Sequence, residues 1–113
     1  MKIVQNQAVQ GDVYVRRIAE LPKGVKKAEP RDGRWIVAHS ETGHHHYVET
    51  GGVTLYESEK NPMICYLQID GGFGDMVHGR SFDTHETLRL GQGVHEVIRQ
   101  RELTPTGWRL ARD

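Results

Sequence analysis

The sequence has little of several features that define common protein classes. Its 113 residues include a single cysteine, Cys65, so no disulfide can form within the chain and a disulfide-stapled secreted domain is excluded. No apolar run approaches the roughly 20 residues of a membrane-spanning helix, and the first residues lack the apolar segment of a signal peptide. No window shows the helical period of about 3.6 residues. We therefore expect a cytoplasmic protein with little helix and no membrane partner.

The composition fits one globular domain. Apolar residues make up 36% of the chain and charged residues 27%, which is polar for a globular protein but not polar enough to predict disorder. No linker or internal repeat divides the sequence, so we treat residues 1–113 as a single domain. Cys65 lies in the apolar run 63–67 and is expected to be a small buried side chain.

Short apolar segments separated by glycine-rich stretches dominate the sequence. β-Branched and aromatic residues concentrate in these segments, and 13 glycines supply many turns. The pattern predicts about eight strands, over residues 13–18, 35–39, 44–48, 53–56, 63–70, 76–78, 87–90 and 94–101. The stretches 50–52, 71–75 and 91–93 are expected to be turns that end one strand before the next begins. The predicted fold class is all-β, a small antiparallel barrel or sandwich of the jelly-roll type.

Three consecutive histidines follow a natural turn at Thr42-Gly43 and begin one of these predicted strands. Alternate residues of an extended strand point to the same face, so His44 and His46 would project together and His45 would project away. Neutral imidazole is a good ligand for divalent transition metals. The pair is therefore predicted to supply half of a metal site at the mouth of the sheet. Solvated histidines on a surface strand are the alternative interpretation.

Two later histidines are candidates for the other half of this site, because distant strands come together in a small barrel. We predict four metal ligands: His44, His46, His78 and His85. The expected cofactor is one divalent transition metal ion, such as zinc, iron, manganese or nickel. The rival arrangement has two or three histidines and one carboxylate from Glu41 or Glu49, which would act as a further ligand or as a catalytic base.

The formal net charge of zero hides an uneven distribution. Residues 16–34 carry seven Lys or Arg against three Asp or Glu, whereas residues 35–98 carry three against nine and hold all seven histidines. Carboxylates near imidazoles favour cation binding. His39 and His95 are expected to be hydrogen-bonded or exposed rather than ligating. The zero net charge and few aromatic residues argue against a nucleic-acid partner.

At the histidine stretch the sequence resembles two families. Gly43, His44, His46 and Glu49 are similar to the first motif of the cupins, in which a further histidine, here His78 or His85, comes from a later strand. The chain also resembles a family of small proteins from bacteria and their phages with a Gly-His-x-His motif. That resemblance runs over most of the chain, from Gly11-Asp12-Val13 through 40–46 to Gly93-Val94 and 99–102. Together these resemblances imply a cupin-like barrel with a histidine-bound metal and a bacterial or phage origin.

Two functions are consistent with these observations. The first is a metal-dependent protein that acts on a small molecule, with the four histidines as ligands. The second is a non-enzymatic phage or bacterial accessory protein, for assembly or host inhibition, in which a metal only stiffens the barrel and the partner is a second copy or another protein. No nucleophile constellation supports hydrolysis by a catalytic triad.

Overall fold

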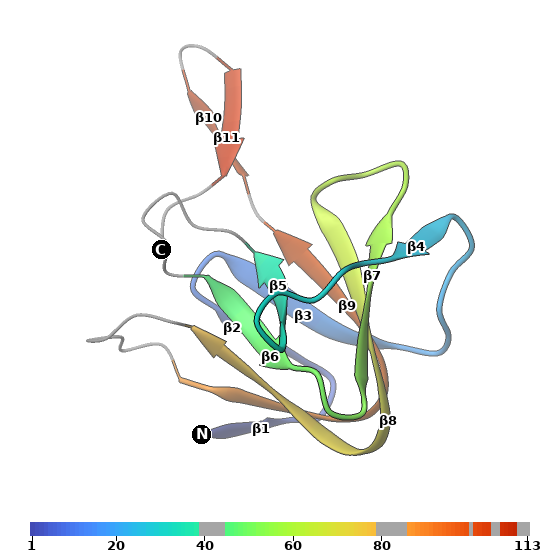
Figure 1. Cartoon of the computed structure of the whole chain (residues 1–113). Helices are drawn as coiled ribbons and strands as arrows, with labels where there is room; N and C mark the ends of the chain where they lie inside the picture. The colour runs from blue at the N-terminus through green and yellow to red at the C-terminus, as the bar shows by residue number, and fades with distance from the viewer. Residues whose placement is uncertain (39–44, 79–85, 100, 105–106, 111–113) are drawn as a thin grey trace.

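The computed structural model describes residues 1–38, 45–78 and 86–99, and the backbone of residues 101–104 and 107–110. This part of the chain contains strands and no helix, which confirms the all-β prediction (Figure 1). The strands are β1 (Lys2–Val4), β2 (Gln7–Gln10), β3 (Val13–Ile18), β4 (Val25–Lys27), β5 (Arg34–Ala38), β6 (His46–Glu49), β7 (Val53–Ser58), β8 (Ile64–His78), β9 (Leu88–Arg99), β10 (Arg101–Thr104) and β11 (Gly107–Leu110). No helix long and apolar enough to cross a bilayer occurs among these described residues.

Nine strands form one sheet, and β10 and β11 form a separate hairpin. The two long strands β8 and β9 pair with each other at the centre of the sheet. Shorter strands share their outer edges: β6 and β7 both pair with β8, and β1 and β3 both pair with β9. The strands β5, β4 and β2 then extend the sheet from β6, β7 and β3. All of these pairings are antiparallel except that of β1 with β9.

The two central strands bend at the same level. The register between β8 and β9 shifts between Ile69 and Phe73, so residues 70–72 of β8 have only residue 92 opposite them. Gly72 and Gly93 have positive φ angles of 87° and 130° on the two sides of this bulge. Such backbone angles are accessible to glycine and strained for other residues. The bulge therefore bends the sheet without ending either strand.

The prediction that residues 71–75 and 91–93 are turns between strands is wrong. Both stretches lie inside continuous strands, β8 and β9, which remain paired on either side of the bulge. Glycine is favoured at turns and at bulges for the same conformational reason, so residue type alone does not separate the two. The third glycine-rich stretch, 50–52, does separate β6 from β7.

The bend folds the sheet over on itself into two layers (Figure 1). One layer contains β1, β5, β6 and the adjoining halves of β8 and β9, and the other contains β2, β3, β4, β7 and the remaining halves. Alternate side chains from both layers fill the space between them. Fully buried examples are Val13, Val15, Val37, Val48, Leu55, Leu67, Ile69, Met76, Leu88, Leu90 and Val97. Cys65 is also fully buried, as predicted, and burial raises the pKa of its thiol to about 11.

Candidate functional site

A polar cluster lies at the end of the sandwich where β6 begins and β8 ends. Its members are Gln10, Asp12, His46 and His78, and we call this region the histidine end. His46 and His78 are cross-strand neighbours and are 1% and 4% exposed. Their ring centroids are 4.1 Å apart and the ring planes differ by 4°. The structure therefore brings together one histidine from each predicted half of the metal site.

The strand alternation that builds the core also turns these two histidines inward. His46 shares a face of β6 with buried Val48, and His78 shares a face of β8 with buried Met76. Val48 and Met76 form the next cross-strand pair on the same face, so the stacked rings extend the core outward by one layer. The two histidines thus occupy positions at which a pair of apolar side chains would otherwise end the core.

Gln10 anchors the pair from the opposite layer. It is the last residue of β2, is 2% exposed, and donates from Nε2 to the carbonyl oxygens of Met76 and Glu86, both at 2.9 Å. Because carbonyl oxygens only accept hydrogen bonds, these contacts fix the orientation of the amide. Its Oε1 then lies 2.8 Å from Nδ1 of His46. Since Oε1 also only accepts, Nδ1 carries the proton, and Nε2 presents the lone pair of the neutral ring.

Asp12 lies on the other side of the His46 ring. The β2–β3 hairpin is closed by the two-residue turn Gly11-Asp12, and Gly11 has the positive φ, 58°, that such turns require. The turn brings Oδ1 of Asp12 to 3.3 Å from Nε2 of His46, and the Asp12 side chain is 12% exposed. A largely buried carboxylate therefore faces the nitrogen whose lone pair Gln10 orients. This combination favours a cation at the same position.

The stacked geometry limits how the two histidines could share a metal ion. The lone pair of a ligating nitrogen lies in its ring plane, and two parallel planes do not meet at one ion. A shared ion would therefore require one of the two rings to rotate about its Cβ–Cγ bond. Among the described residues, no group of three or more His, Cys, Asp or Glu side chains is arranged to hold a metal.

The other predicted ligands and bases fall in two groups. His44, His85 and Glu41 lie outside the described residues. Glu49 is described, and it lies on the exposed face of β6, where one carboxylate oxygen is 3.7 Å from Nε of Arg34. Residues 46–48 of β6 pair with β8 in regular register, and the shift in the pairing of β6 with β5 lies in β5, between Ile36 and Ala38. Alternation along β6 therefore carries Glu49 to the face opposite His46.

His95 is a second buried histidine, and it lies at the bend. It is fully buried, and its Nε2 donates to the carbonyl oxygen of Gly91 at 2.8 Å. Burial lowers the pKa of His95, the hydrogen bond to Gly91 raises it in part, and the nearby Arg17 lowers it further. His95 is thus hydrogen-bonded, as expected from the sequence, and it supports the bend. His39 lies outside the described residues.

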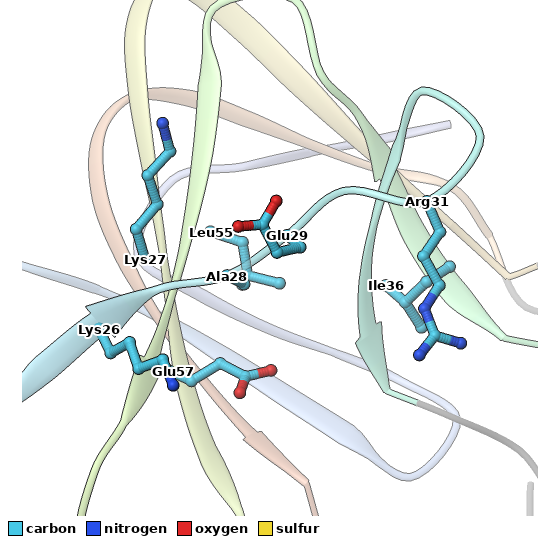
Figure 2. Close-up of a pocket in the computed structure, with 8 residues that line it drawn as sticks. All are labelled: Lys26, Lys27, Ala28, Glu29, Arg31, Ile36, Leu55 and Glu57. Carbon is cyan, nitrogen blue, oxygen red and sulfur yellow. The ribbon is translucent and has the colours of Figure 1, made fainter.

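A surface hollow of about 420 Å³ lies between β4, β5 and β7 (Figure 2). Its lining residues are Lys26, Lys27, Ala28, Glu29, Arg31, Ile36, Leu55 and Glu57. Three cationic and two anionic side chains surround a few apolar ones, so their opposite charges largely offset each other. No histidine lines this hollow, and its mixed charge selects no particular class of ligand.

Sequence analysis missed both Gln10 and Asp12. Residues 7–10 alternate between exposed and buried positions, with Ala8 and Gln10 facing inward. A glutamine at an inward position of an alternating strand was the available signal, because a buried amide must find hydrogen-bond partners. Asp12 gave no comparable signal, since aspartate after glycine is an ordinary turn residue.

The four residues of the histidine end fall inside a family match that covers most of the chain. The family described as a domain of unknown function, DUF8820, matches residues 9–100. No curated protein and no solved structure matches the sequence. The match carries no function with it, so the interpretation of the site rests on its geometry. The chain belongs to the family DUF8820.

Proposed function

We propose that this protein is a small metal-binding protein of cupin-like design, which holds one divalent transition metal ion at the histidine end. The observation that carries the proposal is the buried pair of His46 and His78 on neighbouring strands. Buried histidines are costly unless their nitrogens are used, and a tautomer fixed by an oxygen acceptor is the usual support of a metal-ligating histidine. Gln10 supplies that support to His46.

The proposed ligand set combines the structure with the sequence. His46 and His78 are the described members, and the rotation of one ring would direct both toward one ion. His44 and His85 remain ligands predicted from the sequence. In the chain, His44 comes two residues before His46, and His85 directly precedes Glu86, whose carbonyl oxygen accepts from Gln10. Zinc, iron, manganese and nickel all suit imidazole ligands.

An ion with one open coordination position could act on a small molecule as a Lewis acid or by activating bound water. The apolar layer of Val48 and Met76 directly behind the histidine pair would exclude water from the inner side of the site. We therefore propose a small molecule as the ligand of the metal form. The single buried thiol and the family resemblance favour the cytoplasm of a bacterium or phage-infected host as its location.

Metal analysis of untagged protein tests the proposal. Wild-type protein, a His46→Ala/His78→Ala double variant and a His45→Ala control would be purified without chelator and titrated with Zn²⁺. We expect about one equivalent of metal in the wild type and in the control, and at least a 100-fold loss of affinity in the double variant. Equal binding by the double variant, or no binding by folded wild-type protein, would reject the proposal.

The runner-up is a non-enzymatic accessory protein that works through contact with another protein. Its support is a set of large exposed apolar side chains, which are Met1, Ile3, Val9 and Phe73. Exposed apolar side chains can mark association surfaces. Sedimentation of wild-type protein and an Ile3→Ser/Val9→Ser variant tests this alternative. Concentration-dependent dimerisation that the variant loses would favour it, and a monomer at all concentrations would count against self-association.

A further inference from the structure

We infer that Asp12 is a carboxylate ligand of the metal site and that Gln10 is the positioning residue that directs Nε2 of His46 toward it. The inference rests on the proposed function and adds two residues to it. The sequence left two ligand sets open, which are four histidines or two to three histidines with one carboxylate. The inference favours the set with one carboxylate. The carboxylate comes from the β2–β3 turn rather than from the histidine strand.

The first step is the direction of the His46 lone pair. Gln10 cannot rotate its amide without losing two hydrogen bonds, to Met76 and Glu86. Its oxygen therefore stays on Nδ1 of His46, and the neutral ring keeps its lone pair on Nε2. This is the arrangement in which an outer oxygen fixes the tautomer of a ligating histidine.

The second step is the separation of Nε2 and the Asp12 carboxylate. Both atoms are acceptors when the ring is neutral, so a cation between them would bind to both. Two atoms bonded to one tetrahedral metal ion at about 2.0–2.1 Å lie roughly 3.3–3.4 Å apart. Oδ1 of Asp12 and Nε2 of His46 are 3.3 Å apart. A proton shared by an imidazolium and a carboxylate would hold them closer, at about 2.7–2.9 Å.

The third step is charge. A divalent ion held only by neutral imidazoles would leave two positive charges in a largely buried site. One carboxylate ligand halves that charge, which lowers the desolvation cost of holding the ion there. His46 is 1% exposed and the Asp12 side chain 12%, so both ligand atoms are removed from bulk water.

Titration with Co²⁺, followed by its visible absorption, tests the role of Asp12. The comparison uses untagged wild-type protein, Asp12→Asn and the control Asp70→Asn, which removes the same charge from an exposed residue at the bend. We expect the dissociation constant for Co²⁺ to rise at least tenfold in Asp12→Asn and to change less than twofold in the control. Circular dichroism establishes that each variant is folded.

Nitrogen NMR of the His46 ring in metal-free protein tests the role of Gln10. We expect the proton on Nδ1 in the wild type and a mixture of tautomers in Gln10→Met, together with about tenfold weaker Co²⁺ binding. A change in packing alone would not change the tautomer. A wild-type ring protonated only on Nε2 would overturn the positioning role.

The outcomes separate this inference from the proposed function. Tight Co²⁺ binding that is equal in wild type and Asp12→Asn would overturn Asp12 as a ligand and leave the metal function in place. A folded wild-type protein that binds no Co²⁺ would overturn both. In that case, a His46 ring protonated on both nitrogens would identify an ion pair with Asp12 instead.

Discussion

The bend and the histidine end each bury a histidine, and they surround it with different neighbours. His95 donates to a carbonyl four residues away on its own strand, and the positive charge of Arg17 lowers its pKa. His46 lies between an amide oxygen and a carboxylate. Burial does not distinguish the two rings, which are 0% and 1% exposed. The neighbouring groups distinguish the two rings, because of the two regions only the histidine end places a negative group where a cation could bind.

The two regions also differ in how much of the chain they need. At the bend, the hydrogen bond of the buried histidine is short-range, since His95 and Gly91 belong to the same strand. The histidine end takes residues from β2, the β2–β3 turn, β6 and β8, and Gln10 reaches a carbonyl 66 residues away. A site assembled from four elements exists only after both layers have closed. The bend is therefore expected to be a structural device, and the histidine end a candidate for function.

The largest expected effect concerns the labelling rate of Cys65. It tests whether the layer that contains β7 and the first half of β8 is closed to solvent. Burial raises the pKa of the Cys65 thiol to about 11, so little reactive thiolate forms at pH 8. We expect labelling of Cys65 by a disulfide reagent to be at least 100-fold slower in native protein than in denaturant, which corresponds to at least about 2.7 kcal/mol of protection. Fast labelling of native protein would mean that this layer opens readily. The bend could then not be described as a rigid structural element in contrast to the histidine end.

Substitution at the bend has the next largest effect. Gly93 has a φ of 130°, and a Cβ there would meet Nη2 of Arg17 at 2.7 Å. Gly93→Ala is therefore expected to lower the free energy of unfolding by ~1–3 kcal/mol, measured by urea denaturation. Gly51→Ala is the matched control, because nothing lies within 4 Å of a Cβ at that position. Equal stability of the two variants would show that the bend does not depend on Gly93.

The pH dependence of stability separates His95 from the other histidines. Because burial lowers the pKa of His95, the unfolded chain takes up a proton below about pH 6.5 that the folded chain resists. The contribution of this residue is therefore complete above that pH and is lost as the pH falls, by at most ~1.4 kcal/mol per pH unit. Urea midpoints between pH 5 and 8 should change less steeply in His95→Gln than in wild type. An unchanged slope would show that the bend does not resist protonation of His95.

The smallest expected effect concerns Glu49, which is a neighbour of the site in sequence but not in space. Its side chain is 69% exposed and pairs loosely with Arg34. Glu49→Gln is expected to change the free energy of unfolding by less than about 0.5 kcal/mol and to leave Zn²⁺ affinity unchanged. Calorimetric titration measures both binding and stoichiometry. A tenfold loss of affinity would restore Glu49 as a ligand and weaken the case for Asp12.

Local pattern predicted much of the strand content. Residues 13–18 were predicted as a strand and form β3 with the same bounds, because the buried β-branched Val13 and Val15 alternate there with less buried residues. The inward position of His46 also follows from alternation, since it shares a face with Val48. The predicted strand 94–101 was less accurate. The structure has β9 ending at Arg99 and a hairpin of β10 and β11 beyond it.

The sequence by itself determined that the chain is all-β, that Cys65 is buried, and that histidines lie on a strand next to a turn. These properties depend on residues close together in the chain, through alternation, β-propensity and glycine conformations. Only the tertiary structure decided that β8 and β9 continue through their glycines, and that His78, Gln10 and Asp12 meet His46. Those contacts depend on strand register and on the closing of two layers, and a local pattern of apolar and polar residues does not encode either one.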